Sequence, residues 1–344
     1  MSGYVQESCD ITWLFEKTYT PKIKVQKVDH YKNNQNKVIV LAGPTAVGKT
    51  KLSIELARLL GGEVVCADSM QVYKHMDVGT AKPTPGQQIA VMHHMLDICE
   101  VNEVYNAAEY ARDAKKAISS ILSRNRVPIV VGGSGFYLHC LLYGAPQGPS
   151  SDPSIRLHLE TELELMGAEW LYDKLYQKDP EYAVKITKAD KHKIIRALEI
   201  ITLTGFPVSH FKWNEDKKFD QFNYHCFFLT RPKEKLNQMI ALRAKEMLEH
   251  GLVDEVDFLL DKGLLHNKSA ATAIGYKQVI EYLQNPNQRK ENLLEAITIA
   301  TRQYAKRQLT WFRKEKDFQW LDLDLLKEDE VIRLISEDFQ KFNN

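Results

Sequence analysis

Apolar residues in the chain follow two alternating patterns. Short continuous apolar runs, typical of strands buried on both faces of a parallel sheet, alternate with stretches in which apolar residues recur every three or four positions. The runs lie at residues 38–42, 63–67, 127–131 and 225–229, and helical spacing follows the first run and covers 106–124 and about 288–316. This alternation predicts an α/β fold, with a parallel sheet between two layers of helices.

A stretch rich in proline and glycine, residues 145–153, interrupts the alternation. The pattern after it is helical up to about residue 212, and a strand pattern then returns, so we expect an all-helical insertion within the α/β core. The predicted organisation is an N-terminal extension of uncertain order, a first part of the core, the insertion, and a second part of the core with C-terminal helices, at residues 1–36, 37–144, 145–216 and 217–344.

The loop after the first strand has the form G-x-x-x-x-G-K-[ST] and reads Gly43-Pro44-Thr45-Ala46-Val47-Gly48-Lys49-Thr50. Strand, glycine loop and helix in this order form the context that a phosphate-binding loop requires. Its backbone N–H groups and the following helix N-terminus attract phosphate oxygens. Lys49 adds a cation, and the Thr50 hydroxyl is a candidate ligand for Mg²⁺. The loop does not identify the phosphate compound.

Two further strand ends carry polar residues, Asp68 after the second run and Ser134 after the third. Ligands of open parallel sheets bind beyond the carboxyl ends of the strands, so we expect both side chains to lie beside the phosphate loop. Asp68 has three possible roles: metal ligand, general base, or cap of the following segment. Ser134 is the weaker candidate, because Gly-Gly-Ser is a common turn sequence.

Composition narrows the function classes. A hydrophobic content of 44% and a charged content of 26% are typical of a globular protein, and no run is apolar enough for a membrane helix. The five scattered cysteines lack a C-x-x-C pair, which favours reduced thiols in the cytoplasm. With a net charge of +1, nucleic-acid binding must rest on local basic segments. Residues 185–196 and 302–316 are such segments, although solvated helix faces with buried aromatic residues would have the same pattern.

A set of motifs between Lys37 and Leu321 resembles the tRNA dimethylallyltransferase (tRNA isopentenyltransferase) family. Besides the phosphate loop, the set comprises Asp68-Ser69-Met70-Gln71-Val72-Tyr73, Met76-Asp77-Val78-Gly79-Thr80-Ala81-Lys82-Pro83, His93 with Leu96-Asp97-Ile98, Val131-Gly132-Gly133-Ser134-Gly135-Phe136-Tyr137, Arg196-Ala197-Leu198-Glu199, Ile274-Gly275-Tyr276-Lys277-Gln278, and Thr301 to Trp311. No zinc module follows Trp320, so the chain is similar to the bacterial members. The resemblance implies a P-loop NTPase-like parallel sheet flanked by helices, with an all-helical insertion domain.

The reaction that the resemblance implies moves a dimethylallyl group from dimethylallyl diphosphate to the exocyclic amine of adenosine at position 37 of tRNA. The products are N6-dimethylallyladenosine and pyrophosphate. By the family pattern Asp68 is the base, Ser134 lies beside the reacting groups, Arg243 contacts the pyrophosphate, and Thr50 holds the Mg²⁺ cofactor. The open alternatives are prenyl transfer to free adenine nucleotides, as in adenylate isopentenyltransferases, and a small-molecule kinase that uses the loop for ATP.

The resemblance also implies the partners: the anticodon stem-loop of tRNA and the prenyl diphosphate, with no membrane contact and a monomeric protein. The implied tRNA contacts are Asp68, Ser69, Met70, Gln71, Ser134, Arg156, His192, Lys193, Ile194, Ile195, Arg196, Thr272, Ala273, Ile274, Gly275, Tyr276 and Lys277. The chain departs from the family pattern at three positions, where Ser134 replaces threonine, Met239 an arginine and Val101 a proline. The second departure puts a two-arginine clamp on the pyrophosphate in doubt.

Overall fold

The computed structural model describes residues 36–146, 148–211, 221–285, 287 and 289–341, which all belong to one compact unit. Apart from Asn36, the predicted N-terminal extension lies outside the described residues. None of the described helices is long and apolar enough to cross a membrane. Four cysteines are described, all of them free thiols, and three are buried: Cys66, Cys140 and Cys226.

The described strands form a six-stranded sheet in the order β3-β2-β4-β1-β5-β6. Every pair of neighbouring strands is parallel, which confirms the predicted parallel sheet. The strands are β1 (Lys37–Ala42), β2 (Gly62–Ala67), β3 (His93–His94), β4 (Val127–Gly132), β5 (Asn223–Thr230) and β6 (Gln319–Asp322). Every residue of β1, β2 and β4 is buried, as continuous apolar runs predict. The sequence patterns missed the short edge strands β3 and β6.

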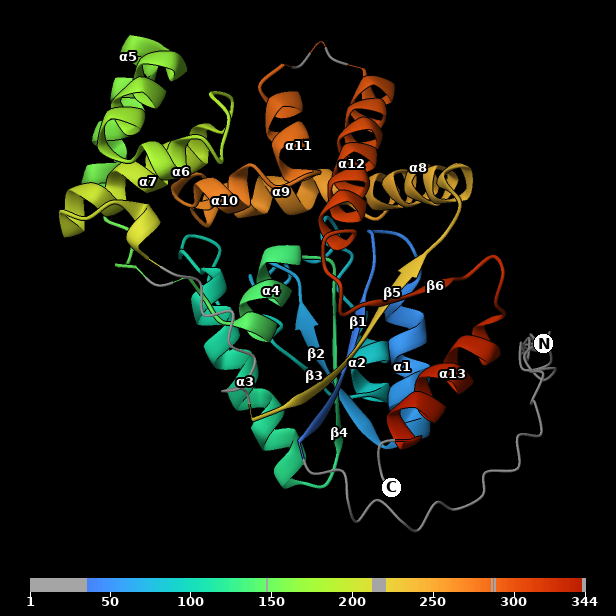
Figure 1. The fold of residues 1–344 in the computed structure, drawn as a ribbon. Coiled ribbons are helices and arrows are strands. Elements are labelled where there is room, and N and C mark those ends of the chain that lie inside the picture. The colour runs from blue at the N-terminus through green and yellow to red at the C-terminus, as the bar shows by residue number, and fades with distance from the viewer. Residues whose placement is uncertain (1–35, 147, 212–220, 286, 288, 342–344) are drawn as a thin grey trace, which may run out of the picture. The chain divides into compact units, whose positions relative to one another are not determined.

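Helices cover both faces of the sheet (Figure 1). On one face α1 (Lys49–Leu60) contacts α13 (Glu328–Lys341), and on the other α3 (Ala107–Ser123) contacts α4 (Gly135–Tyr143). The short α2 (Pro85–Ala90) precedes β3. In α1 the predicted apolar stripe packs inward, because Leu52, Leu56 and Leu60 are buried; Leu59 is exposed.

A second group of helices lies beyond the carboxyl ends of the strands (Figure 1). It consists of α8 (Lys233–Glu249), α9 (Leu252–Asp261), η3 (Leu264–His266), α10 (Lys268–Ala271), α11 (Tyr276–Leu283) and α12 (Lys290–Phe312). Most of its buried residues form a hydrophobic cluster separate from the one around the sheet. Side chains from α8 and α12 therefore face the loops that follow β1, β2 and β4.

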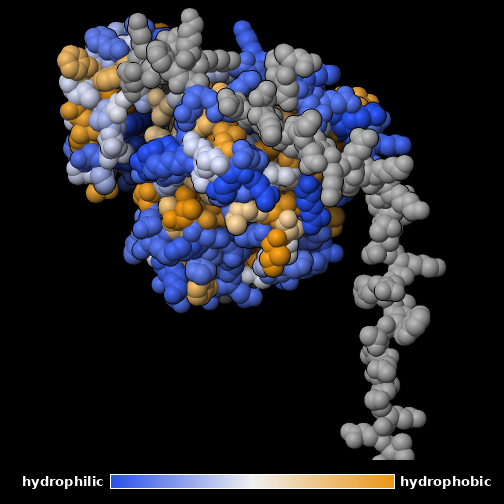
Figure 2. Space-filling view, turned by 90° about the horizontal axis from the view of Figure 1, so that it is seen from below, coloured by the Kyte–Doolittle hydropathy of each residue, from blue (hydrophilic) through white to orange (hydrophobic). Residues whose placement is uncertain are grey.

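The described part of the predicted insertion contains α5 (Pro153–Lys178), α6 (Pro180–Ala183), α7 (Lys191–Thr204) and η1 (Val208–His210), as an all-helical segment requires. These helices have a small core of their own, which includes Leu171, Leu175 and Leu198. In Figure 2 hydrophobic atoms gather at the left edge, where Figure 1 places these helices. The boundaries at residues 145 and 216 stay a sequence prediction.

Candidate active site at the carboxyl edge of the sheet

The phosphate loop has the backbone geometry that its sequence predicts. Ala46 and Gly48 have φ angles of 64° and 110°, in the left-handed region that turns successive N–H groups toward one concave side. Gly43 lies so close to β5 that an added Cβ would be 2.9 Å from the Leu229 carbonyl oxygen. The Lys49 ammonium group donates to the carbonyl oxygens of Gly43 and Pro44, both at 2.8 Å. The loop is therefore a preformed anion cradle with its cation folded back on it.

Positive charge is concentrated beside this loop. The pKa of Lys49 is lowered from 10.5 to about 7: burial is the largest cause, the nearby Arg243 guanidinium also lowers the pKa, and the Asp68 carboxylate raises it. Burial also lowers the pKa of Arg243. Arg243 projects from α8, where Nη1 donates to Thr45 Oγ1 at 3.3 Å and Nη2 to the Thr80 carbonyl oxygen at 3.5 Å. Two desolvated cations beside the loop make this a site that favours a polyanion, although the Asp68 carboxylate offsets part of their charge.

Asp68 follows β2 directly and is half-buried. Its Oδ1 atom accepts from the backbone N–H groups of Met70 at 2.8 Å and Gln71 at 3.4 Å. The capping role left open by the sequence is therefore present, and it fixes the orientation of the carboxylate. Because these bonds occupy only Oδ1, capping is compatible with a proton-accepting role for the second oxygen.

Ser134 is buried at the N-terminus of α4, just after β4. In the sheet, β4 lies between β1 and β2. Its hydroxyl oxygen accepts from the Ser69 backbone N–H at 3.0 Å. The side chain of Tyr304 on α12 lies beside Ser134, and burial, followed by the Asp68 carboxylate, raises the pKa of Tyr304. The structure thus brings the predicted carboxylate and hydroxyl together beside the loop.

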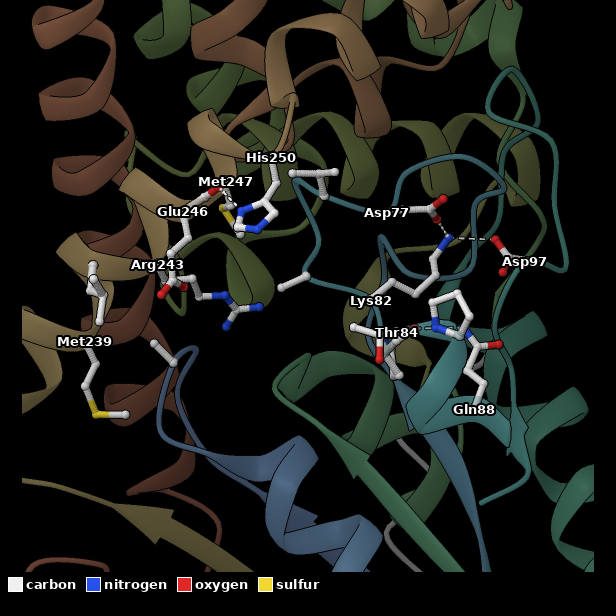
Figure 3. A pocket seen from close by; sticks show the side chains of 16 residues that line it. Asp77, Lys82, Thr84, Gln88, Asp97, Met239, Arg243, Glu246, Met247 and His250 are labelled. Atoms are coloured by element: carbon white, nitrogen blue, oxygen red, sulfur yellow. Dashed lines mark hydrogen bonds and ion pairs between the residues drawn. The ribbon is translucent and has the colours of Figure 1, made fainter. Parts of the chain in front are cut away.

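A cavity of about 660 Å³ opens next to the phosphate loop (Figure 3). Arg243, Met239 and Met247 line it from α8, and Ala46 of the loop borders it. Met239, which replaces the family's arginine, contributes an apolar wall one helical turn before Arg243. The cavity therefore combines the Arg243 cation with apolar side chains, and the carboxylates of Asp77, Asp97 and Glu246 also line it.

Glu255 on α9 is a structural residue of this site that the sequence did not reveal. Its carboxylate accepts from the backbone N–H groups of Asp77 at 2.9 Å, Val78 at 2.6 Å and Gly79 at 3.1 Å, and from the Tyr276 hydroxyl at 2.6 Å. Hydrogen bonds to a charged acceptor contribute about 1.5–3 kcal/mol each. They hold the turn before Thr80, whose carbonyl oxygen accepts from Arg243.

The predicted tRNA contacts differ in their exposure to solvent. Ser69, Met70 and Gln71 lie with Asp68 and Ser134, and they are partly exposed. The exposed side chains elsewhere are those of His192, Lys193, Thr272 and Lys277. The side chains of Ile194, Ile195 and Tyr276 are buried, and contact of these three residues with tRNA stays a prediction. Apolar packing takes them into the hydrophobic cores.

Arg156 and Arg196 meet at the buried carboxylate of Glu199, which the sequence did not identify as a site residue. Its Oε2 accepts from Arg196 Nη1 at 2.7 Å and from Arg156 Nη2 at 3.0 Å. Its Oε1 accepts from the Ser151 hydroxyl at 2.6 Å and from the Asp152 N–H at 2.8 Å. One carboxylate therefore orients two candidate RNA-binding cations and fastens the proline-rich hinge to α7.

The second basic segment lies mainly on α12. Its residues Arg302, Lys306 and Arg307 are exposed, as a phosphate-binding face requires. The interleaved aromatic residues differ from one another: Trp311 is half-exposed, whereas Phe312 packs against Phe228 in the core. The alternative interpretation of buried aromatic residues thus holds for Phe312.

Thr50, the candidate magnesium ligand, is the second residue of α1 and follows Lys49 directly. Among the described residues no group of three or more His, Cys, Asp or Glu side chains is arranged to hold a metal. Mg²⁺ keeps several waters and takes one or two protein ligands together with substrate phosphates. A single hydroxyl at the loop is consistent with that chemistry.

A parallel sheet whose carboxyl edge carries a phosphate loop, a carboxylate and a buried hydroxyl defines a group-transfer enzyme of the phosphate-loop α/β class. The family model described as IPP transferase matches residues 71–315. The tRNA dimethylallyltransferase of Protochlamydia amoebophila is 46% identical over 323 residues, 92% of this chain and 94% of that protein. The Chlamydia felis enzyme of the same name is 44% identical and covers 88% of this chain and 89% of its own length. The chain belongs to the IPP transferase family.

Solved structures agree with this assignment. The full-length tRNA isopentenylpyrophosphate transferase from Bacillus halodurans has a TM-score of 0.65 and 37% identity, covering 89% of this chain and 97% of its own. A eukaryotic dimethylallyltransferase described as acting on tRNA has a TM-score of 0.73 and 31% identity, covering 90% of this chain and 80% of its own. The shared fold confirms the expected P-loop-like sheet with flanking helices.

Proposed function

We propose that this protein is a tRNA dimethylallyltransferase, which transfers a dimethylallyl group from dimethylallyl diphosphate to the exocyclic amine of adenosine 37 in the anticodon stem-loop. The observation that carries this proposal is the grouping of Asp68 and Ser134 beside a phosphate loop whose cations, Lys49 and Arg243, are desolvated. The names and extents of the relatives support the same reaction.

In the proposed mechanism the bond between the allylic carbon and the bridging oxygen breaks, and the adenine amine forms the new bond to that carbon. Negative charge grows on the pyrophosphate, where Lys49, Arg243 and the loop N–H groups stabilise it. Asp68 accepts the proton that the amine loses. The Met70 and Gln71 amides fix the orientation of the Asp68 carboxylate for this role. When bound at Thr50, Mg²⁺ would neutralise part of the pyrophosphate charge.

The acceptor base leaves the anticodon-loop stack to reach the site, at a cost of a few kcal/mol. Phosphate contacts by the exposed cations of α7 and α12 contribute the binding free energy that offsets this cost. Because tRNA is the substrate, we place the protein in the cytoplasm, where it acts as a monomer. Free adenine nucleotides are the less favoured acceptor, since they would leave the Arg156–Glu199–Arg196 cluster and the basic face of α12 without a role.

The proposal is tested by incubating the purified protein with an unmodified anticodon stem-loop, AMP or ATP, each with labelled dimethylallyl diphosphate. Mass spectrometry of the nucleosides then identifies the acceptor. We expect N6-dimethylallyladenosine in the stem-loop only. Prenylated AMP would favour the nucleotide-modifying alternative, and ATP hydrolysis without prenyl transfer would show that the loop serves a kinase or a nucleotide switch.

A further inference from the structure

Gln308 on α12 connects the phosphate loop with the segment that carries Ser134. It does so through an uncharged amide group. Its Oε1 atom accepts from the Thr45 backbone N–H of the phosphate loop at 2.9 Å, and its Nε2 donates to the Gly133 carbonyl oxygen at 2.9 Å. The side chain is buried, with 5% of its surface exposed. Both ends of the amide are thus used, one as acceptor and the other as donor, which fixes the orientation of the group.

The surroundings of Gln308 leave this bridge little freedom. A Cβ atom added at Gly133 would lie 2.2 Å from Gln308 Nε2, so the backbone directly after β4 approaches the amide as closely as only glycine permits. One turn earlier on α12, the Tyr304 side chain lies beside both Ser134 and Gln308. A single helix therefore holds the loop that carries the leaving group and the strand end that carries the acceptor-side hydroxyl.

We propose that Gln308 is a positioning residue that sets the distance between the phosphate loop and the Ser134 side of the site, so that the allylic carbon meets the adenine amine and not water. The inference rests on the proposed function. It assigns Gln308 no contact with substrate: the amide acts through Thr45 and Gly133, to which it is hydrogen-bonded.

Misplacement changes which nucleophile reacts. As the carbon–oxygen bond of the donor loosens, the electron-poor allylic carbon is captured either by the adenine amine or by water. Capture by water forms a carbon–oxygen bond, releases one proton and yields dimethylallyl alcohol with pyrophosphate. A shift of about 1 Å between reacting groups costs about 10²-fold in rate. A loosened loop therefore slows transfer to the amine more than it slows hydrolysis, because the attacking water molecule is not held in one position as the adenine amine is.

The test measures the ratio of dimethylallyl alcohol to prenylated adenosine, using the full chain with saturating stem-loop RNA and donor. Gln308→Glu keeps an acceptor for Thr45 but turns an oxygen toward the Gly133 carbonyl, and Gln308→Met removes both bonds at similar volume. We expect the share of alcohol to rise at least tenfold in both variants, with kcat for transfer reduced by about 10² and the KM for donor changed less than threefold. The matched control is Gln319→Glu, the same replacement at an exposed position of β6, and it should leave the ratio unchanged.

A purely structural role for Gln308 would lower the folded fraction and leave the ratio untouched. Thermal melts and the active-site concentration of each variant therefore accompany the assay. An unchanged alcohol share in both variants, with wild-type enzyme active, contradicts the inference and leaves the proposed function standing. A wild-type protein that transfers no prenyl group contradicts the proposed function, and the inference fails with it.

Discussion

At the carboxyl edge of the sheet, polar side chains from segments far apart in the chain are partly or fully buried beside one another, whereas in the helical insertion the cationic side chains lie at the surface around one buried carboxylate. The first arrangement places Lys49 and Arg243 where burial lowers the pKa of each. The second leaves His192 and Lys193 in solvent. Desolvated groups suit chemistry on a bound anion, and solvated cations suit salt-dependent contact with a long polyanion.

The largest expected effect is the loss of transfer in Asp68→Asn. The asparagine oxygen still accepts from the Met70 and Gln71 amides, so the local fold is kept while the base is removed. General base catalysis contributes about 10²–10⁴-fold, and we expect kcat to fall by that factor. Binding of stem-loop RNA, measured by fluorescence anisotropy, should change less than threefold. Full activity in this variant would rule out the base assignment and leave Asp68 as a cap.

The second prediction concerns the buried carboxylate of the insertion. Glu199→Gln removes the charge that Arg156 and Arg196 share, and breaking a buried ion pair costs about 3–5 kcal/mol. Both arginines are partly exposed, so screening by solvent reduces the expected loss of unfolding free energy to about 2 kcal/mol. The KM for tRNA should rise while kcat stays within twofold, the reverse of Asp68→Asn.

Glu181→Gln is the control for Glu199→Gln, because Glu181 forms an exposed ion pair with Lys185 at 3.0 Å. Chemical denaturation should find a change below about 1 kcal/mol there. If Glu199→Gln lowers kcat as strongly as Asp68→Asn does, the proposed division of labour between the two regions is wrong.

The third prediction is a pH dependence of donor affinity that arises at Lys49. Its pKa of about 7 lies below the ordinary 10.5, so the free folded protein loses this proton above pH 7. The cost of burying the charge is fully present below pH 7 and is relieved as the pH rises toward 10.5. A bound diphosphate favours the protonated amine, so binding takes up a proton above pH 7 and affinity falls by up to about tenfold per pH unit.

Isothermal titration calorimetry with inorganic pyrophosphate at pH 8.5, in buffers of different ionisation enthalpy, measures this proton uptake. Lys49→Met should abolish it, whereas Lys51→Met, at an exposed neighbour on α1, should leave it intact. Proton uptake that survives in Lys49→Met would assign the linkage to another group.

The smallest expected effect is that of Lys193→Gln, which removes one solvated cation from α7. A phosphate contact to single-stranded RNA contributes about 0.7 to the slope of log affinity against log salt, and the variant should lose that amount. Arg196→Glu should reduce the slope too, but it would also set a second carboxylate against Glu199, so Lys193→Gln is the cleaner variant. An unchanged slope would indicate that α7 lies off the path of the RNA.

The sequence predicted those parts of the molecule that depend on local pattern. Continuous apolar runs located the four long strands, and the glycine spacing located the phosphate loop. The two-residue β3 and the four-residue β6 have no such run, so only pairing with β2 and β5 defines them. Glu255 and Gln308 were missed as parts of the site because they act on residues far away in the sequence. Glu255 binds Gly79 and Gln308 binds Gly133, and each pair is more than 170 residues apart.

Burial divides the predicted RNA contacts into two kinds. Ile194 and Ile195 follow the exposed His192 and Lys193 directly, but their helical positions point into the insertion core. A motif that covers consecutive helical residues necessarily includes both faces. The family pattern therefore marks a helix as a whole and does not separate its solvent-facing side chains from its buried ones.

The central claim is that the phosphate loop serves as a cradle for a leaving pyrophosphate, with the bond broken on the carbon side. Dimethylallyl diphosphate labelled with oxygen-18 at the oxygen between carbon and phosphorus tests this claim directly. After transfer to the anticodon stem-loop, mass spectrometry should find the label in the released pyrophosphate. Label-free pyrophosphate, or inorganic phosphate among the products, would contradict the account.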